Sequence, residues 1–293
     1  MVMMAQDPVT LASQADKAAQ SAQSGFSFFG ARTDKYESAV ELYTSAASAY
    51  KLQKSYREAG SLYEKAAMIQ KTKLNEPDDM ANTLQEAFKA YRKTAPEEAA
   101  RVLSLAIDHY LSKGNFRRAA VHKQNLAELY EELSDRRRAR EAYEAAATWY
   151  DDDNASALAN KLYLKAGDLA ALDEDYLPAI QYFEQVARQS ISNNLMRYSV
   201  KDYLLRAGIC HLAFDIVGAK RALESYRDLD PSFLAQKEYQ LLNDLGEAVE
   251  HSDAEVFAEK LFRYDQLSPL NSWCTTILLR IKNKITDHED DFS

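Results

Sequence analysis

Four segments of the chain share a pattern in which a small residue is followed, four positions later, by an aromatic one. They end at Tyr43, Tyr63, Tyr143 and Phe183, and each has an alanine four positions before its ring. Residues four apart lie on the same face of a helix. Alanine lets a neighbouring helix approach closely, and the ring fills the space one turn further along. The pattern predicts amphipathic helices that pack against one another.

Alanine also occurs at eight positions that are separated by multiples of twenty residues: 39, 59, 99, 119, 139, 159, 179 and 219. Twenty residues make one helix and a short turn, and forty make an antiparallel helical hairpin. The repeat therefore predicts an all-α, tetratricopeptide-like (TPR-like) solenoid, although its period exceeds the usual repeat length of about 34 residues.

Composition and helix breakers agree with an all-α chain of two parts. The 293 residues include 8 glycines and 6 prolines, so we expect few tight turns, and β-sandwiches, barrels and glycine-rich nucleotide folds are poor candidates. Breakers separate helical segments at 75–77, 94–96, 113–115 and 151–154. The regular pattern fades after about residue 225, before Asp230-Pro231-Ser232. We therefore predict hairpins over 1–230 and a capping helical bundle over 231–293.

Charge and cysteine content disfavour several function classes. Lys and Arg number 36 against 45 Asp and Glu, a net charge of −9, which argues against nonspecific binding of nucleic acid. Neither Cys210 and Cys274 nor the five histidines have the spacing of metal ligands, and no phosphate-binding glycine motif is present. We expect no enzyme activity, metal or cofactor. With no apolar run of membrane-spanning length and no signal peptide, the expected location is the cytoplasm.

Three phenylalanines, Phe26, Phe28 and Phe29, lie between two glycines in an apolar loop predicted over 24–33. One interpretation is that these rings pack back onto the first hairpin. The other is that they enter a membrane interface or contact a partner.

Basic residues gather between Lys113 and Arg140, and Lys161 and Lys165 share one helix face. Any one of them is explained by a solvated surface, but a row of them in an acidic protein favours an acidic partner. The chain ends in an acidic tail with an apolar residue, Phe292, near its tip. Such a tail is either frayed or an arm that engages a basic partner.

Six phrases, taken in their order, resemble the soluble NSF attachment protein family. They are Ser27–Phe29, Gly114–Phe116, Tyr198–Tyr203, Gly208–Leu212, Trp273–Lys282 and Glu289–Ser293. The resemblance implies a right-handed twisted sheet of helical hairpins followed by a C-terminal bundle. It further implies an adaptor that binds assembled four-helix SNARE complexes and recruits and stimulates the hexameric ATPase NSF, in the cytoplasm and peripherally at membranes.

The resemblance also assigns residues to each partner. The SNARE-binding positions are matched by Lys161 and Lys165, with Arg92 and Lys93 as a further basic pair. Val121 stands where the family has a lysine, so Arg117 and Lys123 nearby are the expected replacements. Phe26, Phe28 and Phe29 match the membrane-contacting loop, and the NSF-binding positions are matched by Asp215, Glu247, Glu250 and Phe292.

Two other functions follow from the residues alone. A general TPR-like scaffold would bind linear peptides in a concave groove without NSF, and comparing an isolated peptide with a folded helical bundle distinguishes it from the adaptor. An enzyme would show turnover, for which no nucleophile, metal site or phosphate cradle is visible in the sequence.

Overall fold

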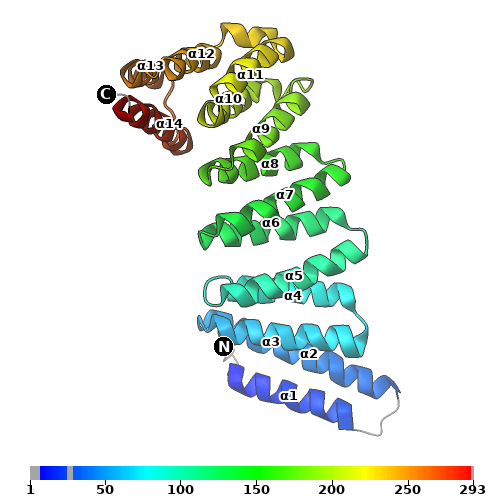
Figure 1. Ribbon diagram of the computed structural model, residues 1–293. Helices are drawn as coiled ribbons and strands as arrows, with labels where there is room; N and C mark the ends of the chain where they lie inside the picture. The colour runs from blue at the N-terminus through cyan, green and yellow to red at the C-terminus, as the bar shows by residue number, and fades with distance from the viewer. Residues whose placement is uncertain (1–6, 25–28, 292–293) are drawn as a thin grey trace. The chain divides into compact units, whose positions relative to one another are not determined.

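The computed structural model describes residues 7–24 and 29–291, and over these ranges the chain is all-α. Fourteen α-helices and three short helical turns make up this part, with no strand. The helices are α1 (Pro8–Ser24), α2 (Phe29–Leu52), α3 (Tyr56–Ile69), α4 (Pro77–Tyr91), α5 (Pro96–Ser112), α6 (Phe116–Glu132), α7 (Arg136–Asp152), α8 (Ser156–Leu172), α9 (Tyr176–Ser190), α10 (Val200–Phe214), α11 (Ile216–Leu229), α12 (Lys237–Glu250), α13 (Ala254–Leu267) and α14 (Ser272–Asp291); the turns are η1 (Gln70–Leu74), η2 (Arg197–Ser199) and η3 (Pro231–Ala235). The predicted TPR-like solenoid of antiparallel hairpins is confirmed (Figure 1).

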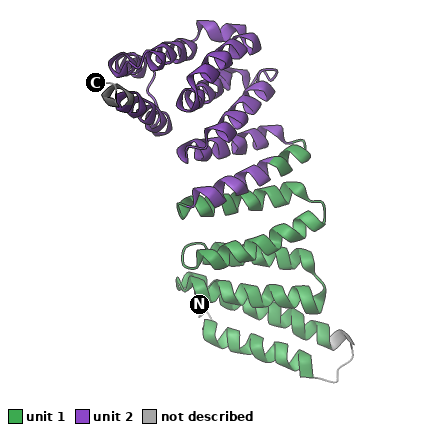
Figure 2. Ribbon diagram, in the orientation of Figure 1, with its two compact units in different colours: residues 1–134, 148–154 green, residues 135–147, 155–293 purple. Residues whose placement is uncertain are grey.

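The chain forms two compact units (Figure 2), the first comprising residues 1–134 and 148–154 and the second 135–147 and 155–293. In the first unit, consecutive helices from α1 to α6 pack side by side as stacked hairpins (Figure 1). In the second unit, α8 to α11 continue the hairpin pattern, and α14 packs back against α8 and α10.

The alanine–aromatic pattern forms the core, as predicted. Ala39, Ala59, Ala139 and Ala179 are fully buried, and the ring four residues after each is at most 5% exposed. Burying a ring of this size contributes roughly 2–3 kcal/mol, so the recurring pair is a main source of cohesion between neighbouring helices.

The left-handed backbone in the short turns between helices was not predicted. The sparse glycines suggested few tight turns, yet six connections between described helices have only three residues, one of which has a left-handed backbone. Only one of these left-handed residues is glycine, Gly114; the others include Lys54, Ser134, Asn154 and Glu174. Glycine content therefore underestimates the number of tight turns in this fold.

Two predicted boundaries differ from the observed elements. α1 extends to Ser24 and α2 begins at Phe29, so helix covers much of the range 24–33 that was predicted as a loop. The boundary at 230/231 lies within the second unit, whose apolar core is continuous from Ala170 to Ile285. The separate C-terminal bundle expected there stays a prediction.

Candidate functional site

The predicted cations at the end of α4 differ in how freely they are available. The Arg92 guanidinium forms a two-pronged ion pair with Glu132, with Nε 3.1 Å from Oε2 and Nη2 2.8 Å from Oε1. It also lies over the ring of Phe88, 5.8 Å from the ring centre. Lys93, the next residue, is exposed and forms no ion pair with any residue that the structure describes. Lys93 is therefore the more available charge of the two.

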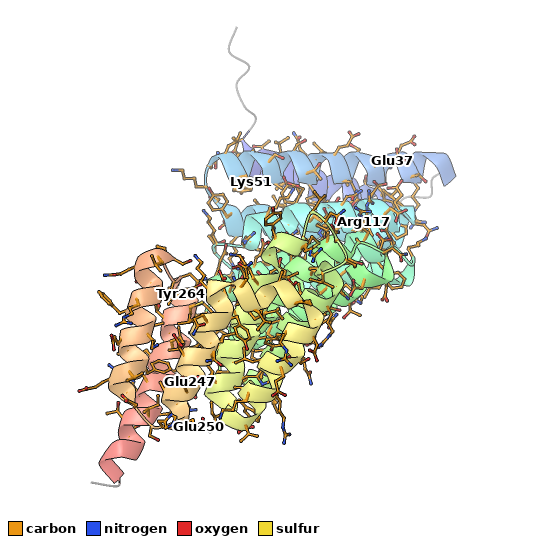
Figure 3. The ribbon with its side chains drawn as sticks, turned by 90° about the horizontal axis from the view of Figure 1, so that it is seen from above. Glu37, Lys51, Arg117, Glu247, Glu250 and Tyr264 are labelled. Carbon is orange, nitrogen blue, oxygen red and sulfur yellow. The ribbon has the colours of Figure 1, made fainter. Side chains whose placement is uncertain are left out.

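The cations of α6 lie along the length of that helix. Arg117, in its first turn, lies 3.6 Å from the Asp153 carboxylate (Figure 3). Lys123 is half-buried in the middle of the helix and lacks an ion pair within the described ranges. Glu132, the partner of Arg92, is the last residue of α6, about 22 Å from Arg117 at 1.5 Å per residue. The cations of the first unit are therefore spread along the length of α6 and form no single cluster.

Lys161 and Lys165 of α8, in the second unit, are both exposed, one helical turn apart. Lys161 has no ion-pair partner among residues 7–24 and 29–291. Like charges at this spacing destabilise an isolated helix by about 0.2–0.5 kcal/mol. The pair places two positive charges on one face of α8.

The basic run 136–140, which the sequence grouped with these cations, is largely neutralised. Its four arginines pair with acids of the same unit: Arg136 with Asp173, Arg137 with Glu141, Arg138 with Asp135 and Arg140 with Asp175. Arg136 and Arg140 join α7 to the α8–α9 connection, whereas Arg137 and Arg138 pair locally at the start of α7. All four charges are thus already paired within the second unit.

The acidic candidates lie together in the second unit, at a groove between α11 and α12. Glu247 and Glu250 are exposed on the last turns of α12 (Figure 3) and form part of the groove wall. Lys220 of α11 reaches across to Glu250, with Nζ 2.5 Å from Oε1, and this hydrogen bond lowers the pKa of Glu250. Asn243 Nδ2 donates to Glu247 Oε1 at 2.8 Å.

Asp215 is the N-cap of α11 and begins the same helix pair. Its carboxylate accepts hydrogen bonds from the backbone N–H groups of Val217 at 3.2 Å and Gly218 at 2.7 Å. These are two of the donors that a helix start leaves unpaired, and capping of this kind contributes about 1 kcal/mol. Asp215 therefore has a structural role in addition to its negative charge.

Sequence reasoning missed two exposed apolar side chains next to Asp215. Phe214 is 55% exposed and Val217 is 54% exposed. The signal was an aromatic residue directly before a capping aspartate, at a helix end where no further helical turn can cover it. Phe26, Phe28 and Phe292 lie outside the described residues, and Phe29 is the first residue of α2.

Comparison with known proteins shows the family of the chain. The family profile described as "Soluble NSF attachment protein, SNAP" matches residues 6–286. The chain belongs to the soluble NSF attachment protein family. It is 50% identical to a probable vesicular-fusion protein sec17 homolog of Neurospora crassa and 52% identical to one of Schizosaccharomyces pombe, over 99% of this chain and the full length of each. The human alpha-soluble NSF attachment protein is 36% identical, over 97% of both chains.

Likeness to solved structures is weaker than likeness in sequence. A signal transduction ATPase of Pyrococcus horikoshii with a tetratricopeptide repeat sensor has a TM-score of 0.41 and 14% identity, over 94% of this chain and 42% of its own. In this member of the soluble NSF attachment protein family, no described helix has the length and apolar character needed to cross a bilayer. No group of potential metal ligands occurs among the described residues.

Proposed function

We propose that this chain is an adaptor that binds assembled SNARE complexes through its cationic positions and recruits and stimulates the ATPase NSF through its acidic C-terminal positions. Membership of the soluble NSF attachment protein family supports this function. The observation that carries the SNARE contact is the exposed pair Lys161 and Lys165 on one face of α8.

The lysine pair suits a partner that is recognised by its charge. Two like charges one turn apart repel each other, and a negatively charged surface relieves that repulsion. Attraction of this kind acts over a screening length of about 8 Å at physiological salt, so it does not require one particular side-chain fit. An adaptor that serves many SNARE combinations benefits from such tolerance.

The remaining cations are expected to contribute unequally. Lys93 and Lys123 carry charges that are not paired with described acids, whereas Arg92 must release Glu132 and Arg117 must release Asp153 before they bind a partner. Exchange of one carboxylate for another yields little net energy at a solvated surface. We therefore assign the larger contributions to the lysines.

We also assign a membrane contact to the phenylalanines near the N-terminus and an NSF contact to the acidic positions and Phe292. Phe26, Phe28 and Phe29 would bring the adaptor to the membrane surface as a reversible peripheral contact, because burial of three rings is too weak for permanent anchoring. Asp215, Glu247 and Glu250 would face basic surfaces of NSF, and Phe292 would stimulate its ATP hydrolysis.

The test is reconstituted SNARE disassembly with NSF and ATP, together with SNARE-complex binding. Lys161→Glu with Lys165→Glu is expected to weaken binding at least tenfold and to slow disassembly in proportion. The matched control is Lys71→Glu with Lys73→Glu, which makes the same change of charge at two exposed lysines of the first unit. Wild-type binding by the Lys161 and Lys165 variant would refute the SNARE contact. Equal binding of an isolated SNARE peptide and the folded bundle would instead indicate a general peptide scaffold.

A further inference from the structure

The α10–α11 turn presents an apolar knob beside the acidic positions, formed by Phe214 and Val217. Asp215, between them in sequence, has an extended backbone with φ −158° and ψ 124°, which ends α10 and begins α11. The change of direction leaves more than half of each apolar side chain exposed. The neighbouring Leu212 and Ala213 are buried, so the exposure is confined to the turn itself.

The turn that bears this knob lies against α12, the helix that carries Glu247, through Leu212 and Ile216. Leu212 and Ile216, on either side of the turn, line the groove together with Gly246 and Glu247. A Cβ added at Gly246 would lie 3.7 Å from Leu212 Cδ2 and 3.8 Å from Ile216 Cδ1, which shows how closely the turn approaches α12 at that point. The turn that carries the knob is therefore packed directly beside the helix that carries the acidic groups.

The charges around the knob specify the chemistry of the partner. Counting Asp215 and Lys284, whose Nζ lies 3.4 Å from the Ala213 carbonyl oxygen, with the groove, there are four carboxylates against three cations: Asp215, Glu224, Glu247 and Glu250 against Lys220, Arg227 and Lys284. Protein interfaces commonly place an aromatic anchor at the centre and charged groups at the rim. A partner that fits this surface is basic and has an apolar socket.

We infer that Phe214, supported by Val217, is the hydrophobic anchor of the acidic docking surface and inserts into an apolar socket on a basic face of the ATPase. The inference rests on the proposed function, because it takes the ATPase as the occupant. Asp215 then has two roles: its carboxylate caps α11 and so fixes the anchor, and its charge faces the basic rim of the socket.

The experiment measures capture of NSF hexamers by the adaptor loaded at equal density on immobilised SNARE complexes. Phe214→Ser is expected to weaken capture by about ten- to a hundredfold, as loss of an interface anchor does. Phe214→Leu, which keeps an apolar side chain, is expected to retain most of the affinity. Leu195→Ser is the matched control, since Leu195 is 92% exposed on the α9–α10 connection and lies away from the groove. Circular dichroism and Trp273 fluorescence check that each variant is folded.

Salt dependence separates the anchor from the charges. A second arm, Asp215→Asn with Glu247→Gln and Glu250→Gln, removes three charges but keeps an oxygen that can cap α11. The loss of NSF capture caused by this charge variant is expected to become smaller between about 0.05 and 0.3 M salt, because added salt screens the electrostatic attraction in the wild type. The effect of Phe214→Ser is expected to remain the same over that range.

The outcomes are distinguishable. If the charge arm weakens capture and Phe214→Ser leaves it at the level of the Leu195→Ser control, the anchor is refuted while the adaptor function stands. If neither arm changes capture, the acidic surface is not where NSF binds, and the proposed function of these residues fails with it. Recovery of capture by Phe214→Leu is the result that supports an apolar socket.

Discussion

Replacing Gly208 by alanine is expected to destabilise the second unit, whereas the same change at Gly246 is not. Both glycines lie inside helices, α10 and α12, where alanine is intrinsically better by about 1 kcal/mol. Their surroundings differ. A Cβ at Gly208 would lie 2.4 Å from Leu242 Cδ1 and 2.7 Å from its Cδ2, but at Gly246 the nearest atoms are 3.7 Å away, at ordinary contact distance.

The size of the effect follows from how little Leu242 can move. Its side chain is 1% exposed and has no route into solvent, so α10 and α12 must separate or Leu242 must leave its preferred rotamer. Overpacking of this kind costs about 1–3 kcal/mol, and an overlap of more than 1 Å belongs at the upper end. After the gain in helix propensity, Gly208→Ala is expected to lose about 2 kcal/mol of unfolding free energy, and Gly246→Ala to gain up to about 1 kcal/mol.

The assay is urea unfolding followed by the fluorescence of Trp273, whose ring packs edge-on against Phe183 in the core of the second unit. A Trp149→Phe background makes Trp273 the only tryptophan, because the chain has two. Adding Leu242→Ala to Gly208→Ala should cost less than the sum of the single changes, because the smaller side chain removes the clash. An unfolding midpoint for Gly208→Ala equal to or above that of Gly246→Ala would refute the steric argument.

Two further predictions concern turns and pH. Lys54 has a left-handed backbone with φ 63°, so Lys54→Gly is expected to stabilise the first unit by about 0.5–1 kcal/mol, whereas Gly114→Ala, at φ 69°, should destabilise it by about 1 kcal/mol. Thermal unfolding measures both changes, and the opposite order of stability would contradict the reasoning. Burial favours a raised pKa for Glu184, but hydrogen bonds with the His211 and Tyr226 side chains outweigh it and hold the pKa below its usual 4.5. The resulting stability is present above about pH 4.5 and is lost as pH falls further. Glu184→Gln should therefore lower the melting temperature at pH 7 and reduce the fall in melting temperature between about pH 4.5 and 3; a fall as steep as in the wild type would contradict this.

The helices and their core faces were predictable because a short-range pattern carries them. Ala39 and Tyr43, or Ala179 and Phe183, need only a helical period to lie on one face, and burial of that face follows from their apolar character. The same reasoning placed Lys161 and Lys165 on a common exposed face. Such features depend on residues at most four positions apart.

The left-handed conformation of the turns was not predictable because it is imposed by packing between helices. Left-handed residues recur at 54, 114, 134, 154 and 174, each five positions before an alanine of the repeat. Three such turns close with a backbone hydrogen bond to the residue five before, from Ser55 N to Tyr50 O, from Asn115 N to Tyr110 O and from Asp175 N to Ala170 O. This arrangement satisfies the last carbonyl groups of the helix. The left-handed conformation costs a lysine or glutamate about 1–2 kcal/mol, and contacts between helices compensate for that cost.

Whether a cation is free for a partner depends on residues one hairpin away, which explains why the basic run misled the sequence reasoning. Several ion pairs between helices join residues 35 to 41 apart, as in Arg140 with Asp175 and Arg57 with Glu98. Arg92 has Glu132 forty positions later and is paired with it. The residues forty positions before and after Lys161 are Val121 and Lys201, and among the described residues Lys161 forms no ion pair with Asp202, forty-one positions later. Seven described arginines pair with an acid at this spacing: Arg57, Arg92, Arg101, Arg117, Arg136, Arg140 and Arg206. For these positions, the equivalent residues of the neighbouring hairpin decide whether a cation stays available to an acidic partner.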